Sequence, residues 1–148
     1  GMTMKVEHVE EFCSRFLEYI DNHIEEVQTQ PILNIDGLLD FSDINMSFYK
    51  QLKRFAPFGP GNEKPIFCTK RVYDYGTSKV VGRGQEHIKL ELIDDKSGKV
   101  INGIAFGQSY QARFIKTKHA FDICYSIEEN THKKNEIQLQ IEDIRPSS

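Results

Sequence analysis

The sequence predicts a mainly β chain in which a helical segment precedes a five-stranded Greek-key barrel. Apolar residues recur at intervals of three and four before residue 28, and at intervals of two after residue 66. The first period is that of a helix and the second that of a half-buried strand. Between them, residues 57–62 have the sequence Pro-Phe-Gly-Pro-Gly-Asn, which can continue neither a helix nor a central strand. We therefore expect a helical segment over residues 1–56, a rigid elbow over 57–65 and a barrel domain over 66–148.

The first expected element is a helix over residues 5–27, with an acidic side and a continuous apolar stripe. The stripe consists of Val6, Val9, Phe12, Cys13, Phe16, Leu17, Ile20, Ile24 and Val27. A second helix is expected around residues 44–55. Because that helix supplies only part of the apolar surface that the stripe needs, a further partner surface is expected.

Five strands are expected after the elbow. The first is long, over residues 66–81, and is interrupted at Gly76. The others cover residues 87–93, 100–106, 120–127 and 137–144, with turn residues between them. Residues 108–118 are too many for a tight turn and predict a short helix between the third and fourth strands. This order is that of a five-stranded Greek-key OB barrel.

Composition and charge are those of an ordinary globular chain. Of 148 residues, 39% are hydrophobic and 28% are charged, and there is neither a membrane-spanning apolar run nor a signal peptide. The three cysteines, Cys13, Cys68 and Cys124, form no Cys-x-x-Cys motif and are expected to be buried free thiols. These observations predict a cytoplasmic protein without membrane contact. Residues 1–56 carry 5 basic and 10 acidic residues, whereas residues 57–148 carry 14 and 12, so the barrel is the more basic part.

The basic residues of the barrel gather where an OB barrel binds its ligands. Such ligands lie across the second and third strands, between the loop joining the first two strands and the loop joining the last two. Lysine and arginine side chains attract phosphates through counterion release, and exposed aromatic rings stack on bases. The candidate nucleic-acid-binding residues are Arg71 and Tyr73 on the first strand, Arg83 and His87 at the first loop, Lys89 on the second strand, and His132, Lys133 and Lys134 in the last loop.

Each of these candidates has a simpler alternative. The tyrosines of the first strand could pack the barrel wall or its contact with the helical segment, because aromatic residues favour strands. The last loop could be a solvated hairpin tip. No catalytic residue and no metal site is expected, because the five histidines are scattered. Asp94 and Asp95 are followed by Lys-Ser-Gly, which predicts a hairpin turn rather than a carboxylate pair.

An ordered series of short matches resembles the C-terminal part of the bacterial RecJ family of single-stranded-DNA exonucleases. The series covers the chain from about Val6 to Pro146. It consists of Leu52-x-x-Phe55-Ala56-Pro57-Phe58-Gly59-Pro60-Gly61-Asn62-Glu63-x-Pro65-x-Phe67, Val81-Gly82, His87-Ile88-Lys89-Leu90, Ile104-Ala105-Phe106-Gly107 and Gln138-Leu139-Gln140-Ile141-x-Asp143-Ile144. By this resemblance, the front third is the tail of the DHH-associated domain and the remainder is the OB-fold domain.

The resemblance implies a parent enzyme that degrades single strands from 5′ to 3′, uses Mn²⁺ or Mg²⁺, and serves DNA recombination and repair. The family's Asp-His-His and Gly-Gly-His motifs do not occur in this sequence, so we expect that the chain alone does not cleave DNA and holds no cofactor. Its implied partners are single-stranded DNA, the upstream catalytic and DHH-associated domains, and other repair proteins.

Two functional hypotheses remain. In the first, the barrel binds single-stranded DNA and guides it to the upstream catalytic domain. In the second, the barrel is a scaffolding or protein-interaction domain with little DNA affinity of its own, which its near-neutral charge favours. An independent hydrolase is disfavoured, because the sequence contains no catalytic constellation.

Overall fold

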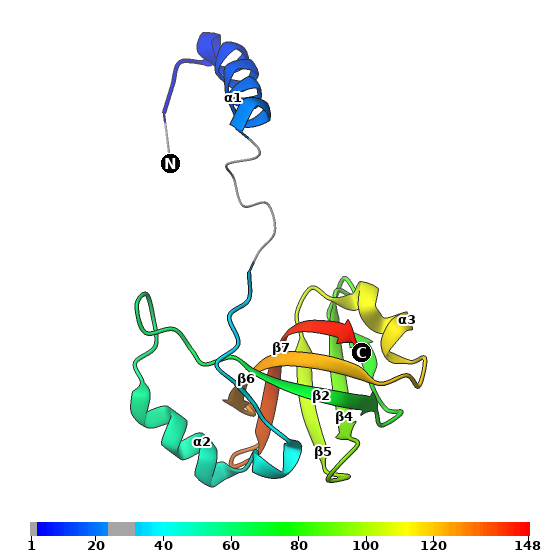
Figure 1. Ribbon diagram of the computed structural model, residues 1–148. Coiled ribbons are helices and arrows are strands. Elements are labelled where there is room, and N and C mark those ends of the chain that lie inside the picture. The colour runs from blue at the N-terminus through cyan, green and yellow to red at the C-terminus, as the bar shows by residue number, and fades with distance from the viewer. Residues whose placement is uncertain (1–2, 24–31) are drawn as a thin grey trace. The chain divides into compact units, whose positions relative to one another are not determined.

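The computed structural model describes residues 3–23 and 32–148. The chain divides into two compact units, residues 1–33 and residues 34–148 (Figure 1). In the first unit, a 3-10 turn at Val6–His8 leads into helix α1 (Val9–His23). The helix expected over residues 5–27 is thus present as far as His23, and residues 24–27 lie outside the described residues.

The second unit contains the five-stranded barrel that the sequence predicts. Its strands are β2 (Phe67–Asp74), β4 (His87–Asp94), β5 (Val100–Ala105), β6 (Phe121–Glu129) and β7 (Ile137–Pro146). They pair in the order β2-β6-β7-β5-β4, and β4 pairs with β2 to close the barrel. The β5–β7 pair is parallel and the other barrel pairs are antiparallel. This is the pairing of a Greek-key OB barrel, so the predicted fold class is confirmed.

Two short strands accompany the barrel strands. The interruption expected at Gly76 is present, because Gly76 has a φ of 111° and ends the first barrel strand. The chain resumes as β3 (Lys79–Val81), which pairs with the beginning of β4. Before the barrel, β1 (Gly37–Leu38) pairs in parallel with β2. Two residues carry no detectable periodicity, which explains why the sequence did not predict this strand.

The helices of the second unit lie where the sequence predicts them, and they are short. A 3-10 turn at Phe41–Asp43 precedes α2 (Met46–Leu52), which ends in a further 3-10 turn at Lys53–Phe55. Asn45 caps α2 by accepting a 3.0 Å hydrogen bond from the backbone N–H of Phe48. The expected helix between β5 and β6 consists of a 3-10 turn at Ser109–Gln111 and α3 (Ala112–Ile115).

The hydrophobic core joins the barrel to the segment before it. Phe41, Ile44 and Tyr49 are buried in the same cluster as the inward residues of the strands. The structure therefore groups residues 34–56 with the barrel, whereas the sequence interpretation placed residues 1–56 in a separate helical segment. The difference arises because these apolar side chains are buried only against the barrel, a contact that local periodicity does not record.

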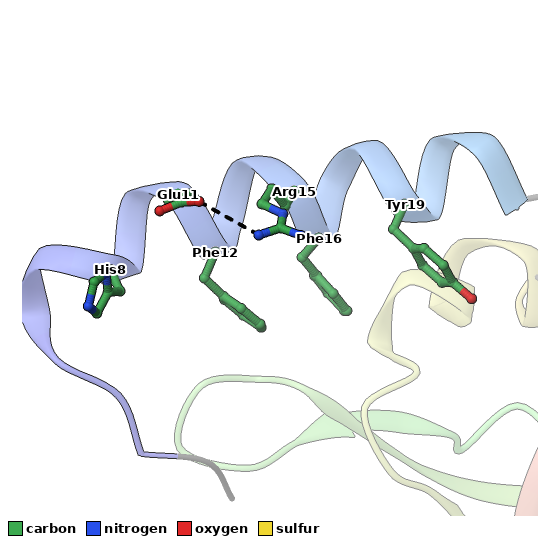
Figure 2. Close-up of a pocket in the computed structure, with 6 residues that line it drawn as sticks. All are labelled: His8, Glu11, Phe12, Arg15, Phe16 and Tyr19. Carbon is green, nitrogen blue, oxygen red and sulfur yellow. Dashed lines mark ion pairs between the residues drawn. The ribbon is translucent and has the colours of Figure 1, made fainter.

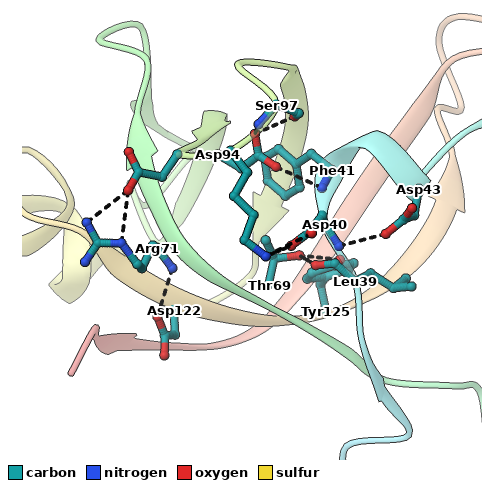
Figure 3. Close-up of polar contacts among 12 residues, drawn as sticks. Leu39, Asp40, Phe41, Asp43, Thr69, Arg71, Asp94, Ser97, Asp122 and Tyr125 are labelled. Atoms are coloured by element: carbon teal, nitrogen blue, oxygen red, sulfur yellow. Dashed lines mark hydrogen bonds and ion pairs between the residues drawn. The ribbon is translucent and has the colours of Figure 1, made fainter.

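Polar contacts reinforce the same junction (Figure 3). The Asp94 carboxylate, only 4% exposed, accepts a 3.0 Å hydrogen bond from the backbone N–H of the fully buried Phe41. The Thr69 hydroxyl donates to the backbone carbonyl of Leu39 at 2.7 Å and lies 2.7 Å from the Tyr125 hydroxyl. Because the single Thr69 proton is already used, the Tyr125 hydroxyl must donate to Thr69. We call this set of contacts, by Leu39, Phe41, Thr69, Asp94 and Tyr125, the junction network.

Replacing Thr69 with valine should lower the free energy of unfolding by about 2–3 kcal/mol, because the Leu39 carbonyl and the Tyr125 hydroxyl lose their buried partner. Tyr125→Phe removes one hydroxyl and leaves the Thr69–Leu39 bond intact, so its cost should be about 1 kcal/mol. Urea denaturation of both variants measures the difference. Equal costs would contradict the assigned donor order.

The elbow closes on itself. The backbones of Gly59 and Asn62 exchange two hydrogen bonds of 2.9 Å. The Asn62 side-chain amide also donates to the carbonyls of Phe55 and Pro57, at 2.9 and 2.8 Å. Gly61 adopts a φ of 80°, a conformation that glycine tolerates best. These bonds join the two ends of a turn that contains two prolines and two glycines.

The cysteines only partly match the expectation of buried thiols. Cys68 is buried and Cys124 is half-buried, and they lie directly opposite each other on β2 and β6. Burial raises the pKa of both thiols, that of Cys124 to about 12, so neither forms a thiolate readily. Cys13 is exposed, and α1, the helix that carries it, has no buried residue.

Candidate nucleic-acid interface

A groove of about 530 Å³ crosses the outer faces of β4, β5 and β7. The hairpin that joins β6 to β7 forms one of its walls. The residues that line the groove are Val81, His87, Lys89, Glu91, Asn102, Ile104, Phe106, Asn130, Thr131, His132, Lys133, Glu136 and Gln138. This is the position that the OB interpretation predicts for a ligand.

Strand register places the lining residues in rows. On β4 the residues at even positions from 88 to 94 are buried, so the odd positions 87, 89 and 91 point outward. Lys89 lies opposite Ile104, and Glu91 lies opposite Asn102, which in turn pairs with Gln138 of β7. The groove floor is therefore a mixed surface of cationic, apolar and amide side chains, which suits a ligand that has both charged and flat apolar parts.

Lys89, which lines the groove, is opposed on the neighbouring strand by a second lysine, Lys79, which is not among the lining residues. Lys79 on β3 is the register partner of Lys89 on β4, so both side chains project from the same face. Like charges directly opposite on neighbouring strands are destabilising. Within residues 3–23 and 32–148, neither lysine forms an ion pair. An anion at this position would relieve their repulsion.

An exposed aromatic ring, that of Phe106, lines the groove together with Lys89. The Phe106 side chain is 55% exposed, and its ring meets the His87 ring edge-on with centroids 5.1 Å apart. The backbone N–H of Gly107 donates to His87 Nδ1 at 3.0 Å, so the Nε2 atom carries the proton of the neutral ring. Glu86 Oε1 lies 3.3 Å from that Nε2 atom. These contacts hold the imidazole, and more than half of the Phe106 side chain remains exposed.

Both carboxylates of the groove are engaged with neighbouring side chains. Glu136 forms a 3.4 Å ion pair with Lys133 and accepts a 2.9 Å hydrogen bond from the Asn102 side chain. Glu91 accepts a hydrogen bond from the Thr77 hydroxyl. Lys133 balances the charge of Glu136, whereas the neutral Thr77 hydroxyl leaves the charge of Glu91 in place. Of the two lysines that line the groove, Lys89 is the one that forms no ion pair with another described residue, so it is the better placed to attract an anion.

The groove brings together four of the eight candidate residues, namely His87, Lys89, His132 and Lys133. Arg83, in the turn before β4, and Lys134, at the hairpin tip, are exposed and do not line it.

Arg71 and Tyr73 also lie outside the groove. The Arg71 guanidinium bonds Asp95 at 3.0 Å and the Tyr73 hydroxyl at 3.2 Å. A β-bulge between Thr69 and Val72, where Arg71 has a φ of 56°, directs this side chain toward the turn after β4.

Sequence reasoning missed Phe106 and Lys79. Alternation along β5 continues to residue 106 and would have placed Phe106 on the same face as Asn102 and Ile104. Lys79 carries no such signal, because its position opposite Lys89 depends on the register across the turn at residues 82–86.

Two further hollows are of a different kind. On α1, the Phe12 and Phe16 rings stack with centroids 5.7 Å apart, and Glu11 pairs with Arg15 at 3.6 Å (Figure 2). All six residues that line this hollow belong to one helical stretch, so it is a helix face rather than an enclosed cavity. A second hollow, of about 210 Å³, lies between α2, the elbow and β6.

The described residues contain no group of three or more His, Cys, Asp or Glu side chains that could hold a metal ion. Within the same part of the chain, no helix has the length and apolar character needed to cross a bilayer.

Known proteins resemble this chain over most of its length. The family model of the RecJ OB domain matches residues 35–143. The single-stranded-DNA-specific exonuclease RecJ of Haemophilus influenzae is 24% identical over 151 residues, which cover 99% of this chain and 25% of that protein. The Bacillus subtilis protein of the same name is 28% identical over 97 residues, which cover 66% of this chain and 12% of that protein.

A solved structure shows the same fold. RecJ of Thermus thermophilus, in complex with Mn²⁺, superposes with a TM-score of 0.67 at 18% identity over 100% of this chain and 20% of that one. The chain thus spans a quarter or less of the length of these relatives. Because the family model covers residues 35–143, well over half of the chain, the chain belongs to the RecJ OB domain family.

Proposed function

We propose that this chain is the single-stranded-DNA-binding, substrate-guiding C-terminal module of a RecJ-like exonuclease. The observation that carries the proposal is Lys89 in a groove across β4 and β5 that also contains the exposed ring of Phe106, with a second cation, Lys79 on β3, opposite Lys89. A DNA strand offers both partners that this arrangement lacks, because its phosphates neutralise lysines and its bases stack on aromatic rings.

The parent enzyme, under this proposal, is a cytoplasmic 5′-to-3′ exonuclease of recombination and repair that uses Mn²⁺ or Mg²⁺. The metal of the Thermus thermophilus complex supports a metal-dependent parent. Because the chain spans a quarter or less of the length of these relatives, the proposal assigns hydrolysis to the catalytic domain of the parent, upstream of the barrel. Under this proposal, the barrel binds the single-stranded DNA and guides it to the catalytic domain.

The test is fluorescence anisotropy of a labelled oligothymidylate titrated with the 148-residue chain at several salt concentrations. Lys79→Ala/Lys89→Ala should weaken binding roughly tenfold and reduce the slope of log affinity against log salt by roughly 1.4, since each contact contributes about 0.7 for single strands. The same variant should be at least as stable as the wild type, because a repulsive pair is removed.

The matched control is Lys50→Ala/Arg54→Ala, which removes two exposed cations on the segment before the elbow, away from the groove lining. It should leave both affinity and salt slope nearly unchanged. An equal loss in both double variants would point to general charge attraction.

The alternative function is a scaffolding or protein-interaction domain. The exposed aromatic side of α1 favours it, because Phe16 is 51% exposed and stacks on Phe12. A folded wild-type chain that binds no oligonucleotide at low salt would overturn the DNA-binding proposal in favour of this one.

A further inference from the structure

The residues that follow β5 in the chain carry a second cationic surface, outside the groove. Residues 96–121 contain no Asp or Glu, and α3 with the residues after it carries Arg113, Lys116, Lys118 and His119. All four side chains are exposed. Within residues 3–23 and 32–148, none of them forms an ion pair, whereas Lys96 is paired with Asp40 at 2.9 Å.

The buried side of α3 decides which residues face outward. Ile115 is buried in the core, and the Phe114 ring packs on Phe121 with centroids 6.0 Å apart. Tyr110, Arg113 and Lys116 recur at intervals of three and therefore share the opposite, exposed side. Tyr110 is 74% exposed. An aromatic ring next to two cations repeats the chemistry of the groove.

This exposed side begins four residues after Phe106, which lines one end of the groove. Gly107 donates its N–H to His87, and the N–H of Ser109 donates to the Glu86 carbonyl at 3.2 Å, so the segment between the two surfaces is tied to the start of β4. Tyr110 follows Phe106 by four positions, which limits their Cα separation to about 14 Å.

Hydrogen bonds to β7 also hold this surface in place. The Gln108 side-chain amide donates to the Ile141 carbonyl at 3.0 Å, and that of Gln111 donates to the Ile144 carbonyl at 3.4 Å. Both acceptors belong to β7, so α3 is fastened to the barrel wall. A fixed platform loses little conformational freedom when it binds.

We infer that the DNA strand does not end at Phe106 but continues over Tyr110 and along the side of α3 that carries Arg113 and Lys116. The inference rests on the proposed function, because it extends the path of the same ligand. It assigns to this surface the sugar-phosphate backbone, contacted by the two cations, and one stacked base, contacted by Tyr110. The groove alone accommodates a short strand, and the α3 side adds contacts only for a longer one.

The experiment compares labelled oligothymidylates of about 5 and about 16 nucleotides, within the range of OB-fold site sizes. Arg113→Ala/Lys116→Ala should weaken binding of the longer oligonucleotide roughly tenfold and reduce its salt slope by roughly 1.4. Tyr110→Ala should weaken it at least about fivefold through lost stacking. Neither variant should change binding of the shorter oligonucleotide. The charge-matched control is again Lys50→Ala/Arg54→Ala, and thermal unfolding checks that every variant folds.

The outcomes separate this inference from the groove itself. If Lys79→Ala/Lys89→Ala weakens both lengths and the α3 variants weaken neither, the groove stands and the extension is overturned. If the α3 variants weaken both lengths equally, the surface is not an extension and the inference is likewise overturned. If the wild type binds neither length, the proposed function fails, and the extension fails with it. Selective loss for the longer oligonucleotide supports the inference.

Discussion

Phe41→Ala should lower the free energy of unfolding of the barrel by about 3–5 kcal/mol, the usual cost of truncating a fully buried phenylalanine. Phe41 is 0% exposed and lies in a 3-10 turn that precedes the barrel by more than twenty residues of sequence. Its side chain is part of the same core cluster as the inward residues of the strands. The loss should therefore appear in the barrel itself, not only in the local turn.

Urea denaturation followed by circular dichroism measures the total loss, and amide-hydrogen exchange of β6 and β7 shows whether the barrel shares it. The matched control is Phe55→Ala, a change of the same residue type in a later 3-10 turn where the side chain is 68% exposed. Its effect should stay within about 0.5 kcal/mol. Unchanged exchange in β6 and β7 of Phe41→Ala would show that residues 34–56 fold apart from the barrel.

Asp94→Ala should cost about 2–4 kcal/mol, because it removes a buried ionised acceptor. The N–H of Phe41 loses its partner at 3.0 Å, and the N–H of Ser97 loses its partner at 2.9 Å. The neighbouring Asp95 is the control, since its 3.0 Å ion pair with Arg71 is exposed and worth at most about 1 kcal/mol. If Asp95→Ala cost as much as Asp94→Ala, burial would not be the cause.

The pH dependence of stability gives a second measure of Asp94. Burial by itself would raise its pKa, but hydrogen bonds from the Ser97 side chain and backbone and from the Phe41 backbone outweigh it, and the pKa lies below the usual 3.8. A carboxyl group with a lowered folded-state pKa stabilises the fold above its unfolded pKa, and this stabilisation is lost as pH falls through the folded pKa. Asp94→Asn should therefore lose less stability between pH 7 and pH 3 than the wild type, as measured by urea midpoints.

The strands and the place of the groove could be predicted because they depend on local pattern. Alternation of apolar and polar residues along residues 87–93 and 137–144 requires only that one face be buried. Once five strands and an intervening helix are counted, the OB pairing identifies the loops that flank its ligand site. Lys89 and the hairpin that carries His132 were found by that route.

The candidates on β2 show where a local pattern stops being sufficient. Alternation along this strand assumes an unbroken ladder, but the bulge between Thr69 and Val72 resets it. Arg71 then bonds Asp95, which is 24 residues later in the chain, and this exposed pair lies outside the groove. A bulge has no sequence signal as regular as the alternation that it interrupts.

Residue order and short-range periods were enough to identify the family, the five barrel strands, the short helix before the fourth of them and the basic loops beside the groove. Three other facts came from the folded chain: Phe41 belongs to the barrel core, Lys79 opposes Lys89, and Arg71 is engaged with Asp95. Each of these facts depends on contact between residues far apart in the chain or on strand register. A period of two indicates which face of a strand is buried, but it does not identify the residue that lies opposite on another strand.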